Sequence, residues 1–178
     1  MPVTVIKFIL LVRYKMIKKY IATFLISMVP LIELRGAIPF GLSDKMGGPL
    51  PIIPLYIVCI IGNMIPVPII FFFARKVLEW GKDKKIIGKF FTWCLTKGEK
   101  AGKKIESKAG KGIYWALFLF VGIPFPGTGA WTGTLATSFL DLDFKKSVLA
   151  IVCGVILAGI LMGLASAGLF GAFGKIFT

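Results

Sequence analysis

The sequence predicts an all-α, polytopic membrane protein, and three observations lead to that class. Hydrophobic residues make up 57% of the 178 residues and the mean hydropathy is +0.86, whereas soluble domains are about 45–50% apolar. Two uncharged stretches are long enough to cross a hydrocarbon core of ~30 Å. Two further apolar stretches are broken by proline and glycine, and irregular backbone at membrane depth is tolerated only where protein or water surrounds it. We therefore expect a single membrane domain over residues 1–178, with two re-entrant hairpins that are each followed by a transmembrane helix.

The N-terminal part of the chain predicts an interfacial helix and then the first hairpin. Residues 1–20 mix apolar positions with lysine and arginine, as in an amphipathic helix that lies on the membrane surface. The hairpin is expected over residues 21–45, of which 21–41 are apolar except for Glu33 and Arg35, and these two stand among prolines and glycines such as Pro39. Ionisable side chains in such a segment are costly unless they are paired or solvated. A structural ion pair is one explanation, and a substrate or proton site at a broken helix is the one that we prefer.

The middle of the chain predicts a transmembrane helix and a basic segment. Residues 52–74 are uncharged and long enough to cross the membrane. Asn63 lies near their centre, where it either hydrogen-bonds a neighbouring helix or contacts a ligand. Residues 75–111 are rich in lysine, with apolar residues at helical spacing between the lysines. We expect this basic amphipathic segment to lie on the anionic cytoplasmic leaflet.

The second hairpin is expected over residues 112–140, which contain no charged residue. Its turn should fall at Gly122–Gly129, because two prolines there remove backbone donors and two glycines are costly inside a helix. The helix that follows the turn would aim its positive N-terminal end at the membrane centre. The candidate substrate- or proton-binding residues of this segment are Pro124, Pro126, Gly127, Thr128, Gly129, Trp131 and Thr132.

The order of the segments predicts an inverted repeat. Each half has a broken apolar segment followed by an uninterrupted span, which in the second half is residues 147–174, and Ile38–Gly41 echoes Ile123–Gly127. If only the two spans cross, the hairpins enter from opposite faces and meet near the midplane. A cytoplasmic 75–111 segment then leaves the basic N-terminus outside, against the positive-inside bias. That conflict disappears if the first broken segment or the N-terminal helix crosses fully, and both alternatives stay open.

Composition narrows the class of function. The lysines and arginines that give the net charge of +14 do not lie within a nucleic-acid-binding motif. They are better explained as determinants of membrane topology and as contacts to anionic lipid. The three cysteines are scattered and the chain has no histidine. A disulfide framework, a histidine-based triad and a histidine zinc site are therefore excluded. We expect neither enzyme activity nor a bound cofactor or metal, and we leave coupling to protons or sodium open.

Three motifs in order resemble those of a known family. They are PLIELRGAIP at residues 30–39, GNMIPVP at 62–68 and IPFPGTGAWTG at 123–133. Over about residues 26–170 the chain resembles the small multi-drug export protein family of prokaryotes, and it is more remotely similar to the DedA superfamily, which includes lipid-carrier translocases. The resemblance implies facing re-entrant hairpins in a multi-pass protein of the cytoplasmic membrane. The arginine that DedA proteins carry beside the second turn has no counterpart here, and Arg35 is the nearest candidate.

These observations predict a transporter for an amphipathic or anionic substrate, of which a lipid phosphate or a phospholipid is the leading example. Arg35 would pair with the anion, and Glu33 would exchange a proton because a poorly solvated carboxyl group has a raised pKa. One alternative is efflux of cationic small drugs, in which Glu33 binds the cation. Another is a membrane scaffold without transport. The expected partners are the lipid bilayer and its anionic lipids, and a homodimer would cover the polar interior.

Overall fold

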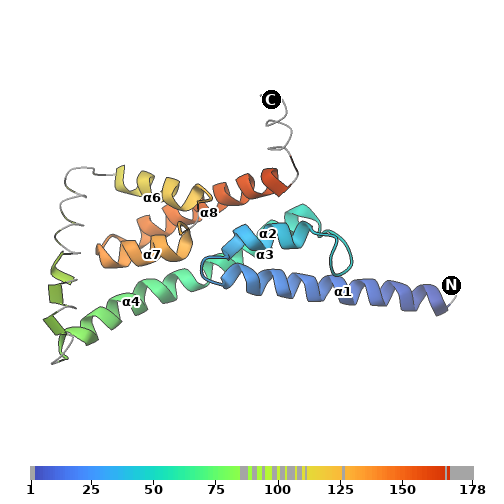
Figure 1. Ribbon diagram of the computed structural model, residues 1–178, viewed down its shortest axis with the longest axis horizontal. Helices are drawn as coiled ribbons and strands as arrows, with labels where there is room; N and C mark the ends of the chain where they lie inside the picture. The colour runs from blue at the N-terminus through green and yellow to red at the C-terminus, as the bar shows by residue number, and fades with distance from the viewer. Residues whose placement is uncertain are drawn as a thin grey trace, which may run out of the picture. The chain divides into compact units, whose positions relative to one another are not determined.

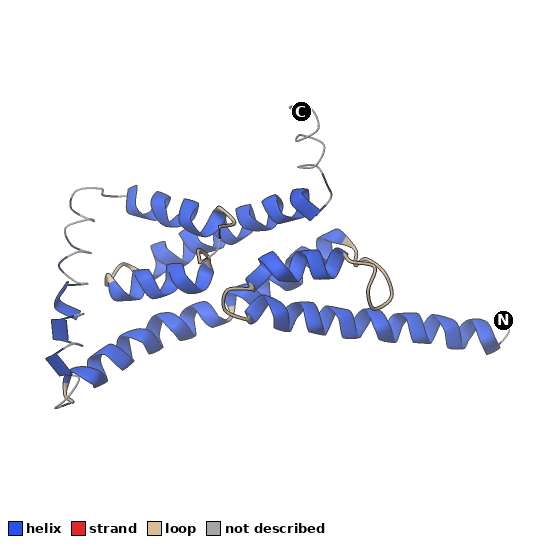
Figure 2. Cartoon of the chain, in the orientation of Figure 1, coloured by secondary structure: helices blue, strands red, loops and turns tan. Residues whose placement is uncertain are grey.

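Every regular element in the described part of the chain is an α-helix, and no strand occurs there (Figure 2). The structure is a computed structural model. It describes residues 3–84, 88, 89, 92, 93, 95–97, 100, 103, 107, 110, 112–125, 127–166 and 168. Two of the described stretches are long and apolar enough to cross a membrane, Ile52–Lys82 and Phe144–Ser166. The all-α class is confirmed, whereas the inverted repeat and the membrane depth of the hairpins stay predictions.

The helices divide between two units (Figure 1). Unit 1 is Met1–Asn63 with Ala158–Thr178, and unit 2 is Met64–Leu157. Unit 1 holds α1 (Val3–Met28), α2 (Glu33–Leu42), α3 (Ile52–Met64) and the end of α8 (Phe144–Ser166). Unit 2 holds α4 (Pro66–Lys82), α6 (Gly112–Gly122), α7 (Ala130–Phe139) and the start of α8.

The first hairpin is made by α1 and α2, which pack against each other in unit 1. Helix α1 runs without a break to Met28, past the boundary at residue 20 that the sequence suggested for the interfacial helix. The reason is local, because α1 contains neither proline nor glycine, whereas Pro30 follows directly. The chain turns over residues 29–32 and returns as α2.

Pro39 lies inside α2, so this proline does not end the helix. The similar sequences Ile38–Gly41 and Ile123–Gly127 therefore adopt different backbone structures. The first stretch is helical, whereas the described residues of the second stretch from Ile123 onward form a turn. A four-residue similarity carries too little information to align two halves of a chain.

The span predicted over residues 52–74 consists of two helices, α3 and α4, which meet at Ile65. Pro66 has no N–H to donate to the carbonyl of Gly62, so the hydrogen-bond ladder is interrupted there. Helix α4 then continues to Lys82, into the segment expected to be interfacial. The amphipathic pattern of that segment rests largely on residues 86–94, most of which lie outside the described residues.

The second hairpin is made by α6 and α7 in unit 2, with the turn at the predicted place. Helix α8 packs closely on α6, since a Cβ at Gly154 would lie 2.7 Å from Val121 Cβ and 2.8 Å from the Phe118 carbonyl oxygen. Helix α8 begins at Phe144, three residues before the predicted start, because Asp143 caps it by accepting a 2.8 Å hydrogen bond from the Lys146 N–H. Of the predicted end of this span, residues 167 and 169–174 lie outside the described residues.

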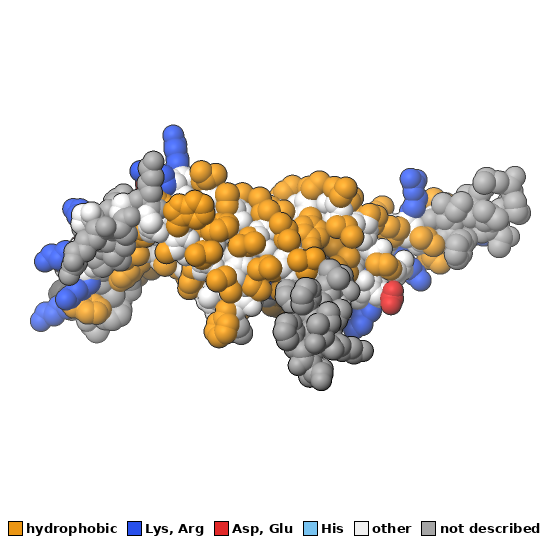
Figure 3. Space-filling view, turned by 90° about the horizontal axis from the view of Figure 1, so that it is seen from above, with side chains coloured by type: hydrophobic (Ala, Val, Ile, Leu, Met, Phe, Trp, Pro, Cys, Tyr) orange, Lys and Arg blue, Asp and Glu red, His pale blue; other side chains and the backbone are white. Residues whose placement is uncertain are grey.

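Apolar side chains gather over the middle of the visible surface (Figure 3). Large hydrophobic residues are exposed on α1, α3, α4, α6, α7 and α8, for example Leu25, Ile53, Phe73, Trp115, Leu135 and Ile160. A surface of this kind is stable in contact with lipid and not with water. The apolar helices and their exposed faces indicate a membrane protein.

Candidate functional site

A line of polar side chains is buried inside unit 1. Lys19, Thr23 and Ser27 are spaced by four residues on one face of α1, and none of them has exposed surface. The Thr23 hydroxyl donates to the Lys19 carbonyl at 2.8 Å, and the Ser27 hydroxyl donates to the Phe24 carbonyl at 2.7 Å. Both hydroxyl protons are thus used by α1 itself, which lets this face pack inside an apolar unit.

Lys19 fixes the end of α2. Its ammonium group donates to the carbonyl oxygens of Ser43 at 2.5 Å and Gly48 at 2.7 Å, just beyond the last residue of the helix. A cation at a helix C-terminus satisfies carbonyl groups and complements the macrodipole. Burial lowers the pKa of Lys19, and the charge of Asp44 partly opposes that shift. The sequence groups Lys19 with the other lysines of the N-terminal helix, whereas the structure buries its side chain.

Replacing Lys19 with methionine is expected to destabilise unit 1 by about 3 kcal/mol, because two hydrogen bonds from a charged donor are lost and two carbonyl groups lose their partner. Lys18→Met is the matched control, since Lys18 is exposed and lies over the Tyr14 ring, so its loss should cost less than about 0.5 kcal/mol. Thermal unfolding in detergent, followed by circular dichroism, measures both. Equal midpoints for the two variants would contradict the role of Lys19.

Glu33 and Arg35 lie in the first turn of α2, directly after the hairpin turn. Glu33 is 4% exposed and Arg35 is half-buried. Burial disfavours the Arg35 cation, and the negative charge of Glu33 partly offsets that cost. The positive end of α2 also favours a carboxylate at position 33. Pro39 is half-buried one turn further on and has no N–H for the Arg35 carbonyl. The structure therefore places an acid beside a base at the tip of the first hairpin.

The backbone of this tip is strained. Leu31 and Glu33 have φ values of 68° and 51°, which put both residues in the left-handed region. That region is uncommon for residues other than glycine, and costs about 1–2 kcal/mol per residue. Strain of this kind persists where the surroundings over-determine it, often at functional sites.

Asn63 is fully buried near the end of α3. Neither its Oδ1 nor its Nδ2 has a hydrogen-bond partner in the described part of the chain, so the interhelical hydrogen bond considered from the sequence is not seen there. Its neighbour Gly62 lies directly against α1, since a Cβ at Gly62 would lie 2.0 Å from the Ser27 hydroxyl oxygen. An unsatisfied buried amide costs about 1–3 kcal/mol. Contact with a ligand stays a prediction for Asn63.

The turn of the second hairpin is closed by its own polar groups. The Thr128 hydroxyl is 3.0 Å from the Ile123 carbonyl oxygen and 2.8 Å from that of Phe125, and donates to either. The Thr132 hydroxyl donates to the Gly129 carbonyl at 3.3 Å. In this conformation both threonine protons stay within the hairpin, so donation to a substrate requires these bonds to break.

The prolines and glycines of the second turn have different surroundings. Pro124 is exposed, and Pro126 lies outside the described residues. Gly127 has a φ of 83° and Gly129 a φ of 148°, which explains why glycine stands at both positions. Space is open around Gly127, where an added Cβ would meet nothing within 4 Å. Gly129 is the N-cap of α7 and is buried.

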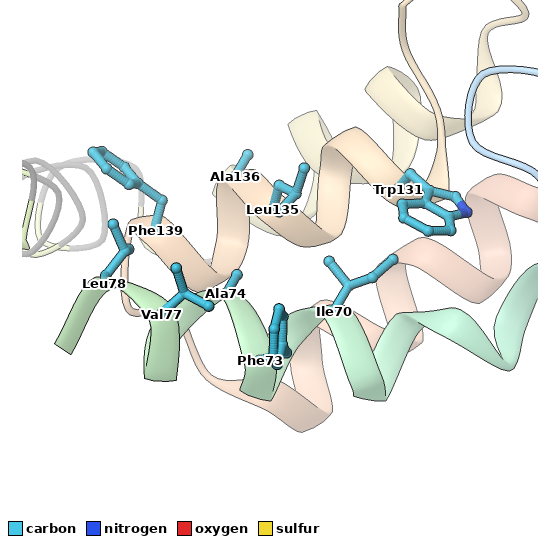
Figure 4. A pocket seen from close by; sticks show the side chains of 9 residues that line it. All are labelled: Ile70, Phe73, Ala74, Val77, Leu78, Trp131, Leu135, Ala136 and Phe139. Atoms are coloured by element: carbon cyan, nitrogen blue, oxygen red, sulfur yellow. The ribbon is translucent and has the colours of Figure 1, made fainter. Parts of the chain in front are cut away.

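An apolar groove of about 610 Å³ runs between α4 and α7 in unit 2 (Figure 4). Its lining residues are Ile70, Phe73, Ala74, Val77, Leu78, Trp131, Leu135, Ala136 and Phe139. Trp131 stands at one end and Phe139 at the other (Figure 4). Of the described residues predicted for substrate binding in this half, only Trp131 lines the groove.

Two contacts that the sequence did not suggest hold the groove walls together. The Ser138 hydroxyl donates to the Phe71 carbonyl at 2.7 Å, and Arg75 forms an ion pair with Asp141. Arg75 also pairs with Glu79 at 3.1 Å within α4 itself. Ser138 and Phe71 are 67 residues apart. A contact at that separation leaves no spacing signal in a single sequence.

The predicted site residues fall into two groups, one in each unit. Glu33, Arg35, Pro39 and Asn63 belong to unit 1, and the residues around the second turn belong to unit 2. Among the described residues no three side chains of His, Cys, Asp or Glu gather as metal ligands would.

Comparison with known proteins finds one family. The family described as "Putative small multi-drug export protein" matches residues 33–161. The matched residues begin at Glu33 and end at Leu161. They include Arg35, Asn63 and the candidate residues around the second turn. No curated protein and no solved structure matches the chain.

Proposed function

Because this chain belongs to the small multi-drug export protein family, we propose that it is a transporter in the cytoplasmic membrane of a prokaryote, and that it moves an amphipathic substrate with an anionic group. The observation that carries the proposal is the buried Glu33 beside Arg35 at the tip of the first hairpin. An acid and a base inside an apolar unit are expensive, and in membrane proteins such groups usually mark a substrate or proton pathway.

The lengths of three of the four hairpin arms support re-entrant hairpins, whereas the fourth arm, α1, has 26 residues and is longer than half of a hydrocarbon core. Helices α2 and α7 have 10 residues each and α6 has 11. At 1.5 Å per residue they are about 15–17 Å long, which is half of a hydrocarbon core of ~30 Å. An arm of that length reaches the middle of the bilayer and returns, but it does not cross.

The exposed side chains of the two turns support the same arrangement. Leu31 in the first turn is 73% exposed, and Phe125 in the second is 67% exposed. Turns that face water are usually built from glycine and short polar residues. Large apolar side chains at the tips of both hairpins fit a position in lipid or along the path of an amphipathic substrate.

The chemistry of the first tip suggests how transport is coupled. A guanidinium group binds a phosphate or carboxylate through two parallel hydrogen bonds. The anion of a substrate that binds Arg35 would compete with Glu33 for the positive charge of the guanidinium group. Proton exchange at Glu33 would then link substrate binding to proton uptake. In unit 2, the groove beside Trp131 offers apolar surface to a hydrophobic substrate.

Efflux of cationic drugs is the second candidate, and the burial of Glu33 favours it. In that case the carboxylate binds the cation and Arg35 has to move away. The two candidates differ in the sign of the transported charge.

Reconstitution into liposomes tests the proposal. The probes are fluorescent phosphatidic acid, which is an anionic amphiphile, and ethidium, which is a lipophilic cation. We expect phosphatidic acid to exchange between leaflets faster than in protein-free liposomes, while ethidium uptake stays at the protein-free rate. Uptake of ethidium alone would support drug efflux, and no effect on either probe would support a scaffold.

A further inference from the structure

A second groove, of about 600 Å³, lies in unit 2 between the start of α8 and the start of α6. It is lined by Gly110, Tyr114, Trp115, Lys146, Leu149, Ala150 and Cys153. Trp115 and Leu149 are 68% and 66% exposed. The groove is therefore a broad apolar surface with one cationic side chain in its lining.

Positive charge is concentrated at one end of this groove. Lys145 and Lys146 both lie in the first turn of α8, which contains no acidic residue. The macrodipole is positive at this end of a helix and disfavours cations. The Lys146 ammonium lies 5.8 Å from the centre of the Tyr114 ring, a cation–π distance that keeps the charge beside the groove.

The nearby acids offset only part of this charge. The Asp143 carboxylate accepts a hydrogen bond from the Lys146 backbone N–H, and Asp141 is paired with Arg75. No ion pair of Lys145 or Lys146 occurs with any described residue. Lys145 and Lys146 carry two positive charges and the capping Asp143 carboxylate carries one negative charge. The remaining positive charge lies in a helix turn where the macrodipole disfavours cations. It points to an anion that completes the site.

The depth of the groove indicates which anion. Helix α8 is long and apolar enough to cross the membrane, and Lys146 stands at its start. From Lys146 to Cys153 the groove follows α8 for about 10 Å. A headgroup phosphate at Lys146 would then place the upper part of an acyl chain along Trp115, Leu149 and Cys153. Basic pockets between membrane helices are typical of sites for anionic lipid headgroups.

We propose that this groove binds one phospholipid with a negatively charged headgroup, and that Lys146 selects the charge. The site is a binding site and not part of the transport path proposed above, which rests on Glu33 and Arg35. Binding at equilibrium is independent of transport, so either proposal can fail without the other.

Quenching of Trp115 fluorescence tests the site in the full chain. Trp80, Trp93 and Trp131 are replaced with phenylalanine, and the detergent-solubilised protein is titrated with brominated phosphatidylglycerol or brominated phosphatidylcholine. We expect half-maximal quenching at an about fivefold lower fraction of phosphatidylglycerol, since one lysine near the headgroup gives about that preference. Equal quenching by the two lipids in the protein that keeps Lys145 and Lys146 would overturn the proposal.

The matched variants are Lys146→Gln and Lys145→Gln, which remove the same charge from adjacent positions. Lys146→Gln should abolish the preference for phosphatidylglycerol, whereas Lys145→Gln should keep most of it, because Lys145 does not line the groove. Lys146→Arg should keep the preference as well. An equal loss of the preference in both glutamine variants would show a diffuse surface potential in place of a site. An unchanged preference in Lys146→Gln would show that Lys146 does not select the charge of the lipid.

Discussion

Replacing Arg35 with glutamine is expected to slow leaflet exchange of phosphatidic acid by roughly 100-fold. The loss of one partner from a buried charge pair costs about 3 kcal/mol, and each 1.4 kcal/mol is a factor of ten. The measurement is the exchange rate in proteoliposomes that contain equal amounts of wild-type or variant protein.

Glu33→Gln and Arg13→Gln complete this experiment. Glu33→Gln keeps the cation at the tip, so we expect a smaller loss of rate together with loss of its pH dependence. Arg13 is exposed on α1, and its replacement should leave the rate unchanged. A severe loss in Glu33→Gln with a mild one in Arg35→Gln would reverse the assignment and favour a cationic substrate.

Gly62→Ala is expected to lower the stability of unit 1 by about 3 kcal/mol, the upper part of the range for overpacked sites. The added Cβ would lie 2.0 Å from the Ser27 hydroxyl oxygen and 2.8 Å from the Phe24 carbonyl oxygen. The second of these is a backbone atom of α1, so α1 and α3 have to separate. The measurement is the midpoint of thermal unfolding in detergent.

Gly159→Ala is the matched control for Gly62→Ala. Both glycines are buried in apolar helices of unit 1, but a Cβ at Gly159 meets its nearest atom, in Tyr56, at an ordinary 3.4 Å. The hydrogen bond from the Tyr56 hydroxyl to the Gly159 carbonyl is also kept. We expect this variant to unfold within about 0.5 kcal/mol of wild type. A similar midpoint for the two alanine variants would contradict the close approach of α1 and α3.

The second hairpin could be predicted from the sequence because its signals are local. Prolines and glycines fall together in one short stretch, and the structure ends α6 at Gly122 and starts α7 at Ala130, within one residue of the predicted limits. Glu33 and Arg35 could also be found, since two charges in an apolar segment are visible without any structure. Their position at the hairpin tip depended on where the first turn falls.

The first turn was harder to place, because two prolines compete for it. Pro30 breaks the chain, whereas Pro39 is accommodated inside α2. The chain alone does not tell which proline a helix tolerates, since that depends on neighbours that satisfy the freed backbone groups.

Contacts between distant segments could not be predicted at all. The Lys19 ammonium reaches carbonyl groups 24 and 29 residues away, and Arg75 reaches Asp141. The four-residue spacing of Lys19, Thr23 and Ser27 indicates that these residues share one helix face. The lysines near Lys19, however, favoured an interfacial position for the start of this helix. Burial of a single lysine among several is decided by packing and not by composition.

The membrane depth of the two turns is the most direct test of the re-entrant arrangement. Spin labels are attached to cysteines introduced one at a time at Leu31 and Phe125, and at Lys15 and Lys45 on the two ends of the first hairpin, in a protein without native cysteines. Relaxation by oxygen and by a water-soluble nickel reagent gives the depth of each label in liposomes. Labels at Leu31 and Phe125 should lie near the bilayer centre, while those at Lys15 and Lys45 contact water on one and the same side. A turn label as accessible to nickel as Lys45, or Lys15 and Lys45 on opposite sides, would contradict it.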